Sequence, residues 1–270
     1  MDVPMQAFAP NKELKIGNGS NGTCVYVGVM EDGSEVAVKR TLTQSGEDTA
    51  ENEKNILNLI KTDEFPFIVS YRNFFRDDTF TYLIVDLCEE DLKNYICSQS
   101  IDYLQQVGPR MINEILTGIT FLHDRQILHR DLKPPNILVD IEGRMRLADF
   151  GISRVLKEDE TTHLTDPKGT QNWMPAEVIG SINSSKKCRF KKKSDVQVVG
   201  MIAFFILSQG KHPFGTSPDC MGNILKGNPV NLGNLDDLHA RQFISWLIRH
   251  DINDRPYAHE ALEHSFVNNN

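Results

Sequence analysis

The sequence lacks the features of an exported or membrane-spanning chain. Residues 1–10 contain no basic stretch followed by an apolar run, so no signal peptide is visible. The most apolar segment, Val198 to Leu207, is too short to span a bilayer. We expect a buried helix there instead.

Cysteine is scarce, and its spacing excludes two common structural roles. The chain has five cysteines, an odd number, and no C-x-x-C pattern. These facts argue against a disulfide framework and against a zinc site. We therefore expect reduced thiols and a cytoplasmic location, with the nucleus as the alternative.

The sequence also lacks an excess of positive charge. It contains 37 acidic and 29 basic residues, which gives a net charge of −8. An acidic chain has no overall attraction for nucleic acid or anionic lipid, so we expect neither as a partner outside a local patch. At 270 residues the chain is long enough to bury a substantial core in one large domain or in two lobes.

The first part of the chain has a strand-like pattern. After a leader over residues 1–13, which we expect to be flexible, a glycine-rich turn over residues 17–22 lies between predicted strands at 14–16 and 23–29. Without side chains, glycines let backbone N–H groups approach phosphate oxygens, although a plain hairpin turn is the alternative. Residues 35–40 then form a strand that carries a lysine in an apolar setting.

A lysine in such a strand needs a carboxylate partner. The apolar spacing over Asp48 to Ile60 predicts an amphipathic helix. We choose Glu53 of this helix over Glu51 as the partner, the alternative being that both lie on a solvated face. Two more strands are predicted at 67–71 and 79–87.

The second part of the chain is mainly helical in pattern. Helices are predicted at 92–97, 104–124, 198–207, 238–248 and 258–264. Between them, His129 to Asn136 places an aspartate and an asparagine five positions apart, with apolar residues on both sides. A loop held between two buried strands can fix polar side chains over a cleft. Asp149 follows a further short strand and precedes a phenylalanine and a glycine.

Taken in order, these motifs resemble those of eukaryotic protein kinases from about residue 14 to residue 267. The motifs are Gly17-x-Gly19-x-x-Gly22, Val36-Ala37-x-Lys39, His129-Arg130-Asp131 with Asn136, and Asp149-Phe150-Gly151. Lys133 resembles the serine/threonine branch.

The resemblance implies an α+β, bilobal protein-kinase fold. A small antiparallel β lobe with one helix would cover residues 14–86, and residues 86–90 would form the hinge. A larger, mainly α-helical lobe would cover residues 91–267, and residues 268–270 would form a tail.

The same resemblance implies transfer of the ATP γ-phosphoryl group to Ser and Thr hydroxyls of protein substrates. Asp131 would position the hydroxyl, and Lys133 would stabilise the transferring phosphoryl group. Lys39 and Glu53 would align the phosphates. Asn136 would complete the catalytic set and hold Mg²⁺.

ATP and Mg²⁺ are the cofactors that the resemblance implies. Asn136 and Asp149 would hold the metal. Ala37 is small enough for adenine to lie flat against its strand, and the hinge backbone would pair with adenine. The residues expected at the nucleotide are Ile16, Gly17, Asn18, Gly19, Ser20, Asn21, Gly22, Cys24, Ala37, Lys39, Val85, Asp86, Cys88 and Leu138.

Residues 149–177 stand where kinases have an activation segment, and they are rich in hydroxyl groups. Arg130 could pair with a phosphorylated residue there, so we expect regulation through this segment, with an unmodified flexible loop as the alternative. Glu177 is expected to pair with Arg255. Kinases read Ala-Pro before this glutamate, whereas this chain reads Pro175-Ala176. The swap leaves the geometry of the substrate-binding loop open.

Two features lie further along the chain. Ser194 is expected to cap the apolar helix, and Asp195 resembles the aspartate that ties this helix to the catalytic loop. Six basic residues lie between Ser184 and Lys193. They fit a solvated insertion, with a dock for acidic partners or a nuclear address as alternatives.

Within the serine/threonine branch, the chain resembles the inositol-requiring kinase/endoribonuclease family of the unfolded-protein response. The resemblance lies in Gly22-Thr23-x-Val25-Tyr26, Val36 to Arg40, Leu87-Cys88, His129 to Asn136 and Gly210-x-His212-Pro213-Phe214-Gly215. That family also carries a luminal sensor, a membrane span and a ribonuclease domain. This sequence contains none of them, so we expect no RNA cleavage.

Two other functions fit the sequence. The chain could be an ATP-binding scaffold without turnover, or the kinase portion of a larger stress-sensor receptor. Besides protein substrates, the expected partners include a second copy of the chain, through self-association with autophosphorylation.

Overall fold

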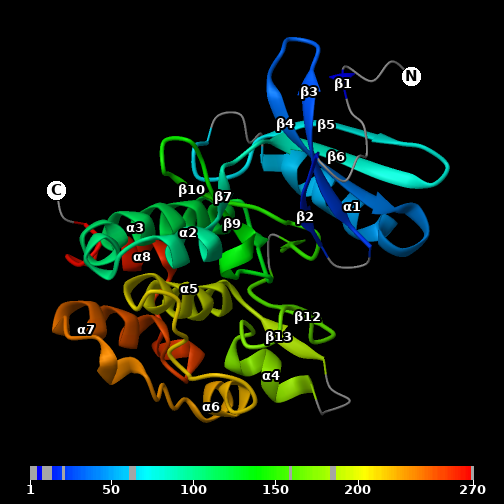
Figure 1. The fold of residues 1–270 in the computed structure, drawn as a ribbon. Coiled ribbons are helices and arrows are strands. Elements are labelled where there is room, and N and C mark those ends of the chain that lie inside the picture. Colours follow the sequence, from blue (N-terminus) through cyan, green and yellow to red (C-terminus); the bar gives the residue numbers. More distant parts are fainter. Residues whose placement is uncertain are drawn as a thin grey trace.

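The computed structural model of the chain describes residues 5–7, 14–19, 22–60, 65–157, 160–182 and 187–268. Figure 1 shows a small lobe built on a sheet and a larger lobe built mainly of helices. The predicted bilobal α+β fold is therefore confirmed. Ser20 and Asn21 of the glycine turn, Lys186 of the basic stretch and most of the leader lie outside the described residues.

The small lobe is a six-stranded antiparallel sheet with the order β1-β3-β4-β6-β5, in which β2 also pairs with β3. Its strands are β1 (Met5–Ala7), β2 (Lys15–Asn18), β3 (Cys24–Met30), β4 (Glu35–Leu42), β5 (Tyr71–Arg76) and β6 (Phe80–Asp86), and its helix is α1 (Thr43–Ile60). Part of the expected leader is thus an edge strand, because Met5 and Ala7 pair with β3.

The prediction of a strand at residues 67–71 is wrong. Ile68 forms only an isolated bridge to Leu147, and the Val69 N–H donates to the Leu147 carbonyl at 3.0 Å. The true strand begins at Tyr71. Residues 67–69 instead join the small lobe to the large one.

Two largely buried helices, α3 (Ile101–Asp124) and α5 (Lys192–Leu207), pack against each other in the large lobe. Its helices are α2 (Leu92–Ser98), α3 (Ile101–Asp124), α4 (Ala176–Ile182), α5 (Lys192–Leu207), α6 (Cys220–Lys226), α7 (Leu238–Leu247) and α8 (Ala258–Leu262), with 3₁₀ turns at Pro134–Asn136, Leu232–Asn234 and Ile252–Asp254. In α5 every residue from Ser194 to Leu207 is buried, as expected for a helix that is apolar on nearly all sides. The N-cap residue of this helix is Lys191, and the prediction that Ser194 holds this position is wrong. Ser194 lies at the third helical position, where its hydroxyl accepts the Lys191 backbone N–H at 3.0 Å, as the third residue of a capping box does.

Short strands complete the large lobe. They are β7 (Glu90–Asp91), β8 (Ile127–Leu128), β9 (Ile137–Val139), β10 (Met145–Leu147), β11 (Arg154–Val155), β12 (His163–Thr165) and β13 (Cys188–Phe190). Strand β8 pairs with β11, and β9 pairs with both β7 and β10. These pairings fix the loops that carry the candidate site.

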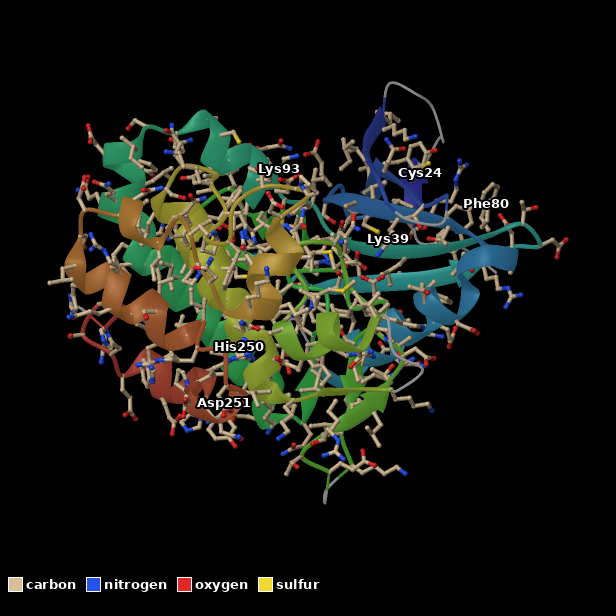
Figure 2. The ribbon with its side chains drawn as sticks, turned by 90° about the horizontal axis from the view of Figure 1, so that it is seen from below. Cys24, Lys39, Phe80, Lys93, His250 and Asp251 are labelled. Carbon is tan, nitrogen blue, oxygen red and sulfur yellow. The ribbon has the colours of Figure 1, made fainter. Side chains whose placement is uncertain are left out.

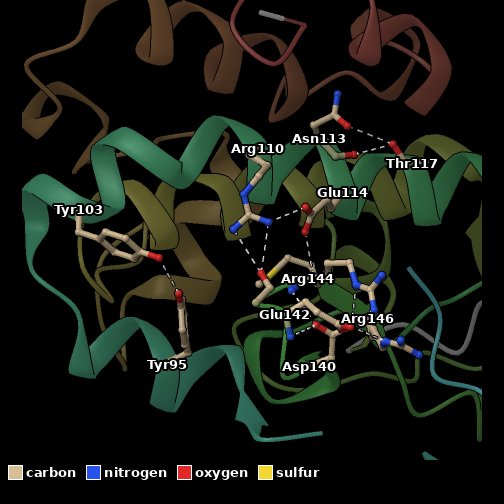
Figure 3. Close-up of polar contacts among 12 residues, drawn as sticks. Tyr95, Tyr103, Arg110, Asn113, Glu114, Thr117, Asp140, Glu142, Arg144 and Arg146 are labelled. Atoms are coloured by element: carbon tan, nitrogen blue, oxygen red, sulfur yellow. Dashed lines mark hydrogen bonds and ion pairs between the residues drawn. The ribbon is translucent and has the colours of Figure 1, made fainter. Parts of the chain in front are cut away.

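Polar contacts link the large lobe to Asp86, where the predicted hinge begins, and Figure 3 shows those around Glu114, Asp140 and Arg146. Glu114 of α3 accepts the Met145 backbone N–H at 2.9 Å. Asp140 accepts from Arg146 at 2.9 Å, and Arg146 also lies 3.4 Å from the Asp86 carboxylate. Helix α3, strand β10 and the hinge are thereby connected.

No helix within the described ranges combines the length and the apolarity that crossing a membrane needs.

His212 makes stability sensitive to acid. Its ring lies 4.9 Å from the Trp173 ring, and burial lowers the pKa of His212 to about 4. The unfolded chain takes up this proton near pH 6.5, whereas the folded protein does so only near pH 4. The free energy of unfolding should therefore fall by about 3 kcal/mol as pH drops from about 6.5 to 4. Melting temperatures measured in steps from pH 7 to pH 4 would follow this loss.

His212→Asn should lose less stability on acidification than the wild type, because the variant cannot titrate there. His250→Asn, at an exposed histidine, should behave like the wild type. An equal acid-induced loss in wild type and His212→Asn would contradict the assignment to His212.

Candidate active site

The loop from His129 to Asn136 is held by a buried carboxylate on α5. Asp195 is fully buried and accepts the backbone N–H groups of His129 and Arg130, both at 3.0 Å. The same carboxylate lies 3.0 Å from Nε2 of His123. The predicted tie between Asp195 and this loop is confirmed. The Asp195 carboxylate thus provides hydrogen-bond acceptors for two backbone N–H groups that are buried away from water.

Lys39, Glu53 and Asp149 form one ion-paired cluster. The Lys39 ammonium lies 2.7 Å from Glu53 and 2.9 Å from Asp149. Glu53 is only 3% exposed, and its other oxygen accepts the Phe150 backbone N–H at 3.2 Å. Figure 2 shows Lys39 where the small lobe meets the large one. Of the two candidate glutamates, it is Glu53 that pairs with Lys39.

The charges in this cluster shift the pKa values of its members. The Lys39 ammonium lowers the pKa of Asp149 to about 2, against the effect of burial. Burial raises the pKa of Glu53, as does the charge of Asp149, while Lys39 opposes them. Burial alone would lower the pKa of Lys39, but the charges of Asp149 and Glu53 raise it. At neutral pH, Asp149 is thus an anion beside a fixed cation.

A second polar cluster surrounds Asp131. Its carboxylate lies 2.7 Å from the Lys133 ammonium and accepts the Thr170 hydroxyl at 2.8 Å. Lys133 also donates to Thr170 at 2.6 Å. The side-chain nitrogen of Asn136 donates to the Asp131 backbone oxygen at 2.8 Å and to its carboxylate at 3.0 Å. Sequence reasoning missed Thr170, which nothing in the sequence distinguishes from neighbouring threonines.

The residues present fit a magnesium ion. Asn136 makes both of these contacts through its nitrogen, so its side-chain oxygen and the second carboxylate oxygen of Asp149 can face a cation. No group of three or more His, Cys, Asp or Glu side chains suited to a metal gathers within the described part of the chain. Mg²⁺ often binds through one or two protein oxygens together with substrate phosphates. The donor set suits that arrangement.

The sheet register decides which residues share a face of the sheet with Lys39. Lys39 pairs with Val25, and Ala37 pairs with both Val27 and Val85. Side chains alternate between the faces of a strand, so Val25 and Ala37 lie on the same face as Lys39.

Cys24 pairs with Arg40 and therefore lies on the face away from Lys39. We replace Cys24 by Val25 in the expected wall of the nucleotide site. Counting alternate residues across the hairpin from Lys39 could have found Val25 from the sequence.

The remaining residues predicted at the nucleotide lie on or near β2, β6 and β9. Ile16 of β2 is 53% exposed, and Leu138 of β9 is half-buried. The Asp86 side chain accepts from Arg72 at 2.5 Å. Burial raises the pKa of the Cys88 thiol to about 12. Gly17 and Asn18 lie on β2, and Gly19 and Gly22 lie in the turn that follows.

The segment that begins at Asp149 contacts the catalytic loop through Arg130. The Arg130 guanidinium donates to the Thr165 hydroxyl and to the Ile152 carbonyl, both at 3.0 Å. Thr165 lies on β12, which pairs with β13 from the basic stretch. In that stretch, the Lys193 ammonium donates a hydrogen bond to the Asn253 carbonyl at 3.1 Å.

The order Pro175-Ala176 has a structural use. Ala176 retains its backbone N–H, which a proline would lack, and donates it to the buried side chain of Gln197 at 2.9 Å. Helix α4 begins at Ala176, directly after the proline. The expected pair of Glu177 and Arg255 is present at 3.0 Å.

Comparisons with known proteins agree with this geometry. The family described as "Protein kinase domain" matches residues 11–267. The chain is 33% identical, over 92% of its length, to the "Sensor for unfolded proteins in the ER ire1" of Schizosaccharomyces pombe. It is 34% identical, over 93% of its length, to the "Serine/threonine-protein kinase/endoribonuclease IRE1" of Oryza sativa. The chain spans only 26% and 30% of the lengths of these two relatives.

Proposed function

Because the chain belongs to the protein kinase domain family, we propose that it transfers the γ-phosphoryl group of ATP to serine and threonine hydroxyls of proteins. The observation that carries the proposal is the meeting of Lys39, Glu53 and Asp149 in one cluster, although Lys39 and Asp149 are 110 positions apart. The names of the relatives, which include serine/threonine kinases, support the same class of acceptor.

The residues divide the work of positioning and charge neutralisation. Lys39, fixed by Glu53, holds the phosphates of ATP. Asp131 orients the attacking hydroxyl and accepts its proton, and Lys133 faces the negative charge of the transferring group. Asn136 and Asp149 would hold Mg²⁺ through side-chain oxygens, and the ion would neutralise phosphate charge. The Thr170 hydroxyl already donates to Asp131, so this carboxylate is arranged to accept such a group.

Asp131→Asn should reduce phosphate incorporation into a serine- or threonine-containing peptide by about a hundredfold or more, because the amide cannot accept the proton. ATP binding and the melting temperature should change little. The readout is incorporation of labelled γ-phosphate by purified protein. Asp78→Asn, at an exposed aspartate between β5 and β6, is the matched control and should retain full activity. Equal incorporation by wild type and Asp131→Asn would favour a nucleotide-binding scaffold.

Regulation through residues 149–177 is part of the proposal. Arg130 already donates to the Thr165 hydroxyl, so a phosphate added to Thr165 would meet a guanidinium.

The proposed location is cytoplasmic or nuclear, and the absence of disulfides among the five free cysteines supports a reducing compartment.

A further inference from the structure

Asn52 of α1 makes contacts that the mechanism above does not use. Its side-chain nitrogen lies 3.1 Å from the Phe150 carbonyl oxygen, 3.0 Å from that of Gly151 and 3.1 Å from that of Ser153. Its side-chain oxygen accepts from the Arg154 guanidinium at 2.6 Å. One side chain thus contacts most of the segment that directly follows Asp149.

Two neighbours on α1 lie against the same segment. Glu53 accepts the Phe150 N–H at 3.2 Å, so α1 holds both backbone polar groups of Phe150. A Cβ on Gly151 would lie 2.4 Å from the Thr49 side chain, so only glycine allows α1 to approach this closely. Residues 49, 52 and 53 are spaced i, i+3 and i+4, which places them on one face of the helix.

We propose that Asn52 is a positioning residue for phosphoryl transfer. By fixing residues 150–154 against α1, it brings Asp149 and the pair of Glu53 and Lys39 into place together. This inference rests on the proposed function. In this proposal Asn52 acts through the placement of Asp149 and Glu53 and not through contact with ATP or the hydroxyl.

The chemistry of an amide explains the choice of asparagine. An amide offers two N–H donors and one acceptor, so it can serve carbonyls on one side and a guanidinium on the other. Aspartate at position 52 would keep the contact with Arg154 as an ion pair but would turn an acceptor toward three carbonyl oxygens. Leucine would serve neither side. The two substitutions therefore separate the two sets of contacts.

Asn52→Asp should lower kcat by about tenfold, the equivalent of about one net hydrogen bond. Its KM for the peptide and its melting temperature should stay close to those of the wild type, because the ion pair with Arg154 compensates. Asn52→Leu should lose both kcat and thermal stability. Asn58→Asp, at an exposed asparagine of the same helix, should change neither. A kcat for Asn52→Asp within twofold of the wild type, or one that falls only in step with the folded fraction, overturns the inference.

Amide hydrogen exchange reads the same contacts without catalysis. In Asn52→Asp, amides of residues 150–154 should exchange about tenfold faster than in the wild type, while those of α7 stay unchanged. If the wild-type protein is an active kinase and the amides of residues 150–154 exchange at the same rate in Asn52→Asp as in the wild type, the inference is overturned. If the wild-type protein transfers no phosphate while these amides remain protected, the proposed function falls, and the catalytic part of this inference falls with it.

Discussion

Lys39→Met should lower the rate of phosphoryl transfer by about 100- to 1000-fold, as expected when a fixed charge is removed from a shielded site. Methionine keeps a long, unbranched side chain but has no charge for the phosphates. The loss should appear in kcat and in kcat/KM for ATP, both measured with a peptide substrate. A variant that retains a third of the wild-type kcat would contradict the role given to Lys39.

The same substitution should also destabilise the fold. It leaves Glu53, only 3% exposed, without its cation, and such a loss typically costs about 3–5 kcal/mol. Adding Glu53→Gln removes the uncompensated charge, so the double variant should regain stability but not activity. Lys54→Met is the matched control. Its partner Glu51 lies 3.3 Å away on the surface, where an ion pair contributes about 0–1 kcal/mol.

Arg255→Met should lower the free energy of unfolding by about 3–5 kcal/mol and the melting temperature by about 10 °C. The Arg255 side chain is fully buried and pairs with both carboxylate oxygens of Glu177, at 3.1 and 3.0 Å. It also donates to the backbone oxygens of Lys193, Arg249 and His250. Methionine fills much of the volume but leaves these acceptors without donors.

Thermal and urea denaturation would test this prediction. Arg249→Met, at an exposed arginine six positions earlier, should shift the melting temperature by no more than about 2 °C. Arg255→Lys keeps the charge but not the planar fork, so it should fall between the two. A drop of less than 3 °C for Arg255→Met would mean that the buried pair contributes little to stability.

The short motifs and the family that they resemble were sufficient to predict the fold class and most of the residues that meet around Lys39 and Asp131. Glycine turns, a lysine in an apolar strand and an aspartate after a buried strand each follow from short-range pattern. The ion pairs of Lys39 with Glu53 and of Glu177 with Arg255 could be predicted because their positions match a known family. Element boundaries were less accurate, as the strand at Tyr71 and the start of α5 at Lys192 show.

The rest of the site depends on contacts between distant segments. Asn52 binds backbone carbonyls some 100 positions away. Every residue has a backbone carbonyl, so the sequence does not indicate which of them Asn52 will bind. Thr170 reaches Asp131 only because its segment folds back over the catalytic loop. Val25 differs from these two, since strand alternation from Lys39 would have identified it.

Asp195 gives the order of synthesis a chemical consequence. It follows Arg130 by 65 positions, yet it is the acceptor for the Arg130 backbone N–H. At about 5–20 residues per second, a ribosome needs about 3–13 seconds to add that stretch. A nascent chain that already contains Lys39, Asp131 and Asp149 therefore lacks the group that holds its catalytic loop. The proposed phosphoryl transfer therefore has to wait until translation has passed Asp195, in the last third of the chain.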